Sequence, residues 1–246
     1  MIRAHMATYP PRVATLRAAL DSIAPQVDRV FLCLNEYVEA PGFLAEYNNL
    51  TTFHPERDLK DIGKFAAPDV ADGDDVFLVD DDLIYAKGYV AHMMNVVPEI
   101  ADHPIVLGVH GSIMRTGFRH KGYKRQYFNF PKAQAQSICV DQLGTGTIYL
   151  KGRQMPALDD MADAQGYADI RFARLSHQRD ITLICVARDA GMIRQQVTDS
   201  SLYHSFTRRL PDAVFDEVKI YGRRPAHLGQ PVDTFLSRGH AAPADT

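Results

Sequence analysis

Short apolar runs separated by polar turns recur along the chain, and their lengths predict alternating strands and helices. Runs of four or five apolar residues, at 30–34 and 76–79, are typical of strands buried on both faces of a parallel sheet. Ahead of the first of these runs, apolar side chains recur at helical spacing at Val13, Leu16, Leu20 and Ile23. The pattern therefore predicts a strand (2–7), a helix (12–24) and a second strand (30–34), joined as a right-handed βαβ unit.

The remainder of the chain continues this alternation. Further strands are predicted at residues 50–54, 105–109 and 180–187, and further helices at 89–100, 158–166 and 210–221. Residues 169–175 begin either a helix or a turn. Because neither a repeat nor a linker divides the sequence, we expect one domain over residues 1–238 followed by a disordered tail at 239–246. The expected fold class is α/β, with a mixed, mainly parallel central sheet.

Composition narrows the class of protein. A chain of 246 residues that is 46% hydrophobic can bury a full core, and its net charge of -3 gives no reason to bind nucleic acid. The cysteines Cys33, Cys139 and Cys185 lie among apolar neighbours, which favours reduced core residues over disulfides or a metal cluster. There is neither a signal-peptide pattern nor an apolar run long enough to span a bilayer. These features predict a cytoplasmic protein without a transmembrane segment, and leave open a peripheral association with a membrane.

Three consecutive carboxylates follow the predicted strand at 76–79: Asp80, Asp81 and Asp82. In open α/β sheets, ligands bind outside the carboxyl ends of the strands. Adjacent carboxylates repel one another, so a compensating positive charge is expected beside them. A hard divalent cation that bridges to a phosphate would supply it. The competing interpretation is a solvated acidic turn.

The triplet is one of several motifs that occur in an order found in a known enzyme family. The others are the turn Thr8-Tyr9-Pro10-Pro11-Arg12, Asn35 after the second strand, Asp61-Ile62-Gly63-Lys64-Phe65, Gly144-Thr145-Gly146 and Tyr167-Ala168-Asp169. Over about residues 1–205, the chain resembles glycosyltransferases of the GT-A fold, with the triplet as their DxD motif. It looks most like the bacterial family-2-type enzymes that build surface polysaccharides.

This resemblance implies transfer of a sugar from a nucleotide-sugar donor, usually a UDP-sugar, to the hydroxyl of a glycan or lipid-linked acceptor. It also implies Mn²⁺ or Mg²⁺, because a divalent ion stabilises the negative charge on the departing diphosphate. By analogy, Asp82 binds the metal and Asp80 reaches the ribose or the donor sugar. Asp81 is either a sugar contact or a structural residue.

The resemblance extends to other binding residues. Donor binding is expected from Thr8, Arg12, Asn35, Asp61 and Lys64, and acceptor binding near Gly144, Thr145 and Gly146. Ordinary structural roles compete with these assignments: Thr8 could cap a helix, and Arg12 and Lys64 could be solvated. Asp61 could orient Lys64 or contact the nucleobase.

Asp169 is the leading candidate for the general base of an inverting enzyme, because a carboxylate near the sugar can deprotonate an acceptor hydroxyl. The family often has Glu-Asp where this chain has Ala168-Asp169, and Asp169 could instead cap a helix. Rival bases are Asp159, Asp160 and Asp163.

A histidine near the C-terminus often supplies a further metal ligand in these enzymes. His204 is the candidate here and His177 is the alternative, whereas His5 and His110 fall within strands and are expected to be core or supporting residues.

Two other functions fit parts of the pattern. A sugar nucleotidyltransferase would need a glycine-rich phosphate loop after the first strand, where this chain has Pro10-Pro11-Arg12. A non-catalytic nucleotide- or glycan-binding subunit would retain the fold without turnover. The basic segment from Arg115 to Arg125 would bind an anionic acceptor, close over the donor as a lid, or be a solvated loop.

Overall fold

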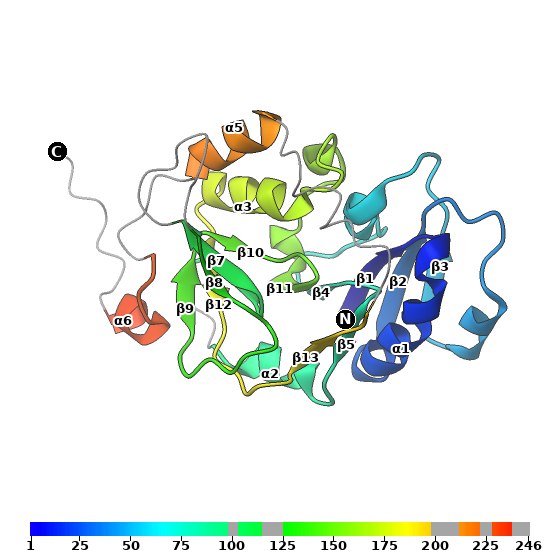
Figure 1. Cartoon of the computed structure of the whole chain (residues 1–246), viewed down its shortest axis with the longest axis horizontal. Helices are drawn as coiled ribbons and strands as arrows, with labels where there is room; N and C mark the ends of the chain where they lie inside the picture. Colours follow the sequence, from blue (N-terminus) through cyan, green and yellow to red (C-terminus); the bar gives the residue numbers. More distant parts are fainter. Residues whose placement is uncertain (98–102, 115–124, 198–211, 222–227, 238–246) are drawn as a thin grey trace.

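A computed structural model describes residues 1–97, 103–114, 125–197, 212–221 and 228–237. Its centre is an eight-stranded sheet with the order β3-β2-β1-β4-β11-β6-β12-β9 (Figure 1). The strands are β1 (Ile2–Thr8), β2 (Arg29–Leu34), β3 (Leu50–Phe53), β4 (Asp75–Val79), β6 (Ile105–Gly108), β9 (Ile138–Val140), β11 (Thr147–Lys151) and β12 (Thr182–Cys185).

The sheet is mixed and mainly parallel, as predicted. Strands β3, β2, β1 and β4 run parallel to one another, and β12 runs parallel to β6. Strand β11 lies antiparallel between β4 and β6, and β9 is an antiparallel edge strand. Because β1 connects to β2 on one side and pairs with β4 on the other, the strand order reverses between β1 and β4. Such a reversal opens a crevice at the carboxyl ends of the strands.

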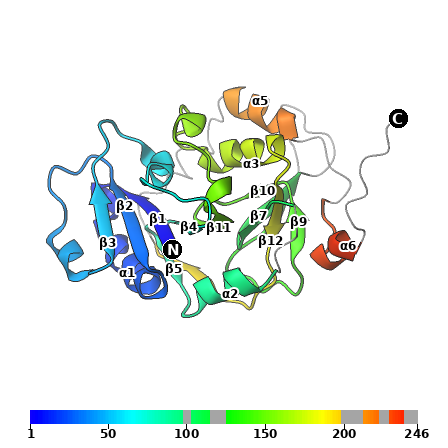
Figure 2. The same cartoon turned by 180° about the vertical axis from the view of Figure 1, so that it is seen from behind.

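Helices cover both faces of the sheet. Helices α1 (Val13–Ile23) and α2 (Tyr89–Asn95) lie below it in Figure 1, and α3 (Ala168–Gln178) and α5 (Asp212–Tyr221) lie above it. The view from behind shows the same layers (Figure 2). Strand β4 contributes to both cores: Phe77 and Val79 pack on the side of α1, and Val76 and Leu78 pack on the side of α3. This two-sided burial explains its continuous apolar run.

Shorter elements complete the described fold. Strands β7 (Gly111–Met114), β8 (Arg125–Phe128) and β10 (Gln142–Leu143) form a second sheet, and β5 (Leu83–Tyr85) pairs with β13 (Ile193–Gln195). The 3-10 helices are η1 (Pro10–Arg12), η2 (Ala24–Gln26), η3 (Gly42–Glu46), η4 (Lys60–Phe65), η5 (Gly152–Gln154) and η6 (Asp159–Met161), and α6 (Val232–Ser237) packs near β9.

Most predicted elements are present, but the boundaries of some differ. The helix predicted at 158–166 is wrong: only η6 is helical there, because Asp163 and Gly166 have φ of 62° and 86°, which a right-handed helix does not allow. Residues 169–175 belong to α3. Helix α2 ends at Asn95, and the last three residues of the helix predicted there, as well as the tail at 239–246, lie outside the described residues.

The cysteines and the lengths of the helices bear on two expectations from composition. Cys33, Cys139 and Cys185 are free thiols in the core, as predicted. Among the described residues, none of the helices has the length and apolar character needed to cross a bilayer.

Candidate functional site

A cavity of about 950 Å³ opens at the edge of the sheet where β1, β2 and β4 end. The residues that end or follow these strands line it: Thr8, Asn35 and Asp80. Strand β11 begins at the same edge because it runs antiparallel to β4, with Thr147 opposite Val79. The segment Gly144-Thr145-Gly146 therefore reaches the cavity as well. The topology thus gathers these distant motifs at the reversal of strand order.

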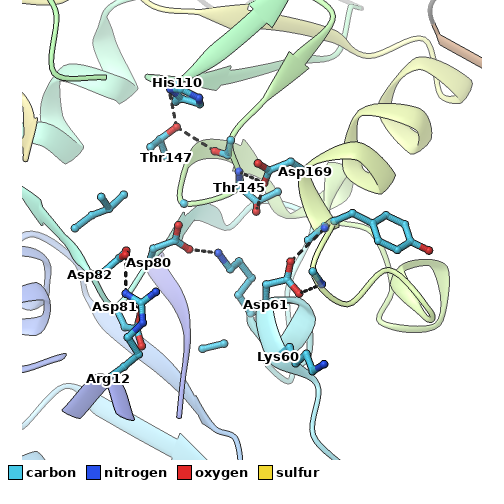
Figure 3. A pocket seen from close by; sticks show the side chains of 18 of the residues that line it. Arg12, Lys60, Asp61, Asp80, Asp81, Asp82, His110, Thr145, Thr147 and Asp169 are labelled. Carbon is cyan, nitrogen blue, oxygen red and sulfur yellow. Dashed lines mark hydrogen bonds and ion pairs between the residues drawn. The ribbon is translucent and has the colours of Figure 1, made fainter. Parts of the chain in front are cut away.

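Each end of the acidic triplet has a cationic partner in the cavity wall. Nη1 of Arg12 lies 2.6 Å from Oδ2 of Asp82 and 4.0 Å from Oδ1 of Asp81. Lys64 forms an ion pair with Asp80 and is itself buried. Figure 3 shows Arg12 directed toward the triplet. The compensating positive charge expected beside the triplet is therefore present in the chain itself.

Burial and charge set the ionisation of this cluster. Burial raises the pKa of Asp81 to about 7, with Asp82 and Asp80 adding to the effect and Thr8 and Arg12 opposing it. For Lys64, burial alone would lower the pKa, but the neighbouring carboxylate of Asp80 outweighs it and the pKa is raised. Lys64 is therefore a buried, charged partner of the triplet and not the surface lysine of the competing interpretation.

The hydroxyl of Tyr85 links the backbone of Asp80 to Gly146, the residue before β11. The hydroxyl of Tyr85 accepts a hydrogen bond from the Asp80 amide at 2.8 Å and donates one to the Gly146 carbonyl at 2.7 Å. A Cβ atom on Gly146 would lie 1.9 Å from Oδ2 of Asp80, so glycine is required for this approach. The glycine predicted for acceptor binding thus also makes room for the first carboxylate of the triplet.

Asp169 lies in the first turn of α3 and faces the same cavity. Its Oδ1 accepts hydrogen bonds from the Thr145 amide at 2.8 Å and the Thr145 hydroxyl at 2.6 Å. These two bonds hold the carboxylate in one orientation, as Figure 3 shows.

Two of the predicted donor residues bond to backbone groups. Asn35 donates to the Lys60 carbonyl at 3.1 Å and accepts from the Leu59 amide at 2.9 Å. Asp61 accepts hydrogen bonds from the amides of Gly166 and Ala168, and burial raises the pKa of its carboxyl group. Both side chains line the cavity while they join separate segments around it.

Part of the cavity wall comes from residues around β8, of which the sequence interpretation singled out only Arg125, at the end of the basic segment. Arg125, Tyr127 and Asn129 line the cavity, followed by Phe130. The first three alternate along β8 and its end, so one face of this strand faces the cavity. That alternation is a signal in the sequence, but it gains meaning only once the second sheet places β8 here. His110 also lines the cavity, from the turn between β6 and β7 and not from within a strand.

The remaining candidates lie elsewhere. The rival bases Asp159, Asp160 and Asp163 are not among the lining residues, and Asp160 pairs with Arg179 on the surface. His177 lies 2.8 Å from the Asp141 carbonyl and stacks on Tyr221, while His5 is buried in the core as predicted. His204 and residues 115–124 of the basic segment lie outside the described residues.

A hard divalent cation in a protein is bound by several oxygen ligands. Within the described ranges, no group of three or more His, Cys, Asp or Glu side chains forms a site made by protein alone. Asp80 and Asp82 are hard oxygen donors on the cavity wall. Since Mg²⁺ is usually bound by one or two carboxylates together with substrate phosphates, these residues fit an ion that a phosphate shares.

Comparisons with known proteins identify the fold. No protein-family model matches the sequence, and no curated protein matches it significantly. Glucosyl-3-phosphoglycerate synthase from Mycobacterium tuberculosis, solved with Mn²⁺, UDP-glucose and phosphoglyceric acid, is similar in structure with a TM-score of 0.52 and 13% identity, over 92% of this chain and 81% of that one. Its complex with Mn²⁺ and UDP-glucose alone gives the same TM-score, over 92% and 80% of the two chains.

A 2-C-methyl-D-erythritol 4-phosphate cytidylyltransferase from Francisella tularensis is more distant, with a TM-score of 0.39 and 9% identity over 85% of this chain and all of that one. The likeness to the synthase confirms the predicted GT-A fold.

Proposed function

We propose that this protein is a glycosyltransferase that moves a sugar from a nucleoside-diphosphate donor, with UDP as the expected nucleotide, to a hydroxyl of a glycan or lipid-linked acceptor. One observation carries the proposal. A single cavity brings together a cation-paired acidic triplet at the strand-order reversal and a separate, firmly oriented carboxylate, Asp169. The first fits a diphosphate and its metal ion, and the second fits a base for the acceptor.

Donor binding is assigned to the wall formed by the ends of β1, β2 and β4. Thr8, Arg12 and Asn35 would surround the nucleoside, with Asp80 and Asp81 near the ribose and donor sugar. Arg12 and Lys64 are the cations available for the diphosphate. When the donor binds, its phosphates would compete with Asp82 and Asp80 for these cations, which leaves carboxylate oxygens for a metal ion.

Mn²⁺ or Mg²⁺ would be held by Asp82, and by His204 if the resemblance extends to that residue, and would supply Lewis-acid stabilisation of the departing diphosphate. The synthase with a similar fold was solved with Mn²⁺ and UDP-glucose, which supports this pairing of metal and donor. The acceptor would enter near Gly144, Thr145 and Gly146, beside the wall formed by β8.

The proposed chemistry is a displacement at the anomeric carbon. The acceptor oxygen forms a bond to this carbon, the bond from the carbon to the diphosphate oxygen breaks, and the nucleoside diphosphate leaves with the electron pair. Asp169 takes the acceptor hydroxyl proton through its second carboxylate oxygen, because Oδ1 is occupied by Thr145. Attack from the face opposite the leaving group would make the enzyme inverting. We assign it to polysaccharide assembly on the resemblance described above.

A screen for nucleotide release tests the proposal. The full chain is incubated with a panel of UDP-sugars, with and without Mn²⁺, and UDP is measured. We expect metal-dependent UDP release with at least one sugar. Release of pyrophosphate from a sugar phosphate and UTP would instead indicate a nucleotidyltransferase. Tight UDP binding without any release, even with acceptors present, would indicate a non-catalytic binding subunit.

A further inference from the structure

The short helix η4 contacts both chemical centres of the cavity. At its C-terminal end, Lys64 forms the ion pair with Asp80. At its N-terminal end, Asp61 bonds to the segment that leads into α3. Lys64 and Asp80 are 16 positions apart in the sequence, and Asp61 and Gly166 are 105 apart, so these contacts join distant parts of the chain. A six-residue helix thus connects the acidic triplet to the helix that carries Asp169.

Both carboxylate oxygens of Asp61 take part in this connection. Its Oδ1 accepts a hydrogen bond from the Gly166 amide at 2.6 Å, and its Oδ2 accepts one from the Ala168 amide at 3.2 Å. The first amides of a helix have no partner within the helix, so a carboxylate from another segment can fix where the helix begins. Ala168 directly precedes Asp169, and Figure 3 shows Asp61 turned toward this backbone. These two bonds hold the Asp61 carboxylate toward the start of α3.

The helix η4 is itself held in place. Asn35 bonds to the Leu59 amide and the Lys60 carbonyl at its start, and Nδ1 of His5 lies 3.1 Å from the Lys64 carbonyl at its end. A Cβ on Gly63 would lie 2.8 Å from Sγ of Cys33, so this helix packs closely on β2. Because both ends and the middle of η4 are anchored, this helix can hold the groups that it contacts at a fixed distance from each other.

We infer that η4 is a brace that sets the position of Asp169 relative to Asp80, and that Asp61 is a positioning residue for the proposed base and not a donor contact. The catalytic consequence of this inference rests on the proposed function. The anchoring of the start of α3 by Asp61 is independent of the proposed function. A reaction that needs the acceptor oxygen and the donor carbon in line is sensitive to this spacing, since a misplacement of about 1 Å can reduce a rate about 100-fold.

Substitutions at Asp61 test the brace. Asp61→Asn keeps one accepting oxygen and loses one of the two hydrogen bonds, whereas Asp61→Ala loses both. We expect kcat for sugar transfer to fall about 10-fold in the first and about 100-fold in the second. The dissociation constant for UDP, measured by calorimetry, should stay within about twofold of wild type in both. Asp160→Asn is the matched control, because it removes an exposed carboxylate that precedes α3 and does not line the cavity.

A second readout keeps the inference testable without turnover. Hydrogen exchange at the amides of 166–169 should be faster in Asp61→Asn than in wild type or Asp160→Asn, while exchange in β1 and β4 stays unchanged. Unchanged exchange at 166–169 would overturn the brace. A weaker affinity for UDP that parallels the loss of kcat would make Asp61 a donor contact instead. If wild type releases no UDP from any sugar, the proposed function fails, and hydrogen exchange still decides whether Asp61 anchors α3.

Discussion

Arg12 pairs with Asp82 across the mouth of the cavity, with its Nη1 2.6 Å from the Asp82 Oδ2. The side chains are 7% and 13% exposed, so the pair is almost completely desolvated. A residue expected to bind the donor and one expected to bind the metal thus neutralise each other in the free protein.

Asp82→Ala should lower the free energy of unfolding by about 3 kcal/mol, because it leaves the Arg12 guanidinium buried without its closest counter-charge. The double variant Arg12→Met/Asp82→Ala should recover most of this loss. Urea unfolding of wild type, Arg12→Met, Asp82→Ala and the double variant completes a double-mutant cycle that measures the coupling. Arg17→Ala, which breaks the exposed pair with Glu46, should cost much less than Asp82→Ala and is the control. Strictly additive effects at Arg12 and Asp82 would contradict a coupled pair.

The same substitution should also abolish the dependence of UDP binding on metal. If Asp82 holds the ion, adding Mn²⁺ will strengthen UDP binding to wild type and leave Asp82→Ala unaffected. Calorimetric titration of UDP with and without Mn²⁺ measures this, at a temperature where the variant is folded. Asp72→Ala removes an exposed carboxylate ahead of β4 and should behave as wild type. An unchanged metal effect in Asp82→Ala would remove this residue as a ligand.

Asp169→Asn should bind UDP with wild-type affinity and lose transfer by about 100- to 10,000-fold, the range expected on removing a general base. Thr145→Val removes the hydroxyl bond to Asp169 but keeps the backbone bond, so its loss should be smaller. Initial rates at saturating donor provide the comparison, and NMR of the product anomer tests inversion. Full turnover in Asp169→Asn would exclude it as the base.

Gly146→Ala should weaken UDP binding about 10-fold or more. The new methyl group would lie 1.9 Å from Oδ2 of Asp80 and must push that side chain away from Lys64. Overpacking of this kind typically costs about 1–3 kcal/mol. Gly42→Ala is the control, because a Cβ there meets no atom within 4 Å. The measurement is calorimetry with UDP, and equal affinities for the two variants would argue that Asp80 does not contact the donor.

Because of the buried His5, the free energy of unfolding should decrease as the pH falls below about 6.5. Its Nε2 accepts a hydrogen bond from Nε of Arg3 at 2.9 Å, so Nδ1 carries the proton shared with the Lys64 carbonyl. Burial and the charge of Arg3 lower the pKa of His5 from 6.5 to about 3. Between these values, the unfolded chain binds a proton that the folded protein does not, so the free energy of unfolding falls as pH decreases from about 6.5 to about 3.

His5→Gln can preserve both hydrogen bonds without titrating. It should reduce the loss of unfolding free energy between pH 6.5 and pH 4 by up to several kcal/mol. Urea unfolding from pH 8 to pH 4 tests it, with the exposed His54→Gln as the control. Parallel curves for wild type and His5→Gln would show that the neutral imidazole is not responsible.

Local pattern was sufficient for much of the fold. The helical spacing from Val13 to Ile23 predicted α1, and the run before Asp80 predicted a strand buried on both faces, since each pattern depends on neighbours within one element. The short strands β5, β7, β10 and β13 were not predicted, because a strand of two to four residues is too short to show a clear alternation of apolar and polar residues. The prediction of a helix at 158–166 failed because Asp163 adopts the left-handed backbone conformation, which its sequence neighbours do not reveal.

The sequence by itself determined the α/β class, the strand that presents the acidic triplet and the order of motifs that resembles GT-A enzymes. Tertiary structure decided which of those side chains meet. Arg12 with Asp82, Lys64 with Asp80, and Asp61 with the start of α3 are pairs from separate elements. Their partners depend on strand order and on how η4 packs against β2 on the α3 side of the sheet. Such contacts leave no periodic trace in the chain, because they depend on distances between elements and not on spacing within one.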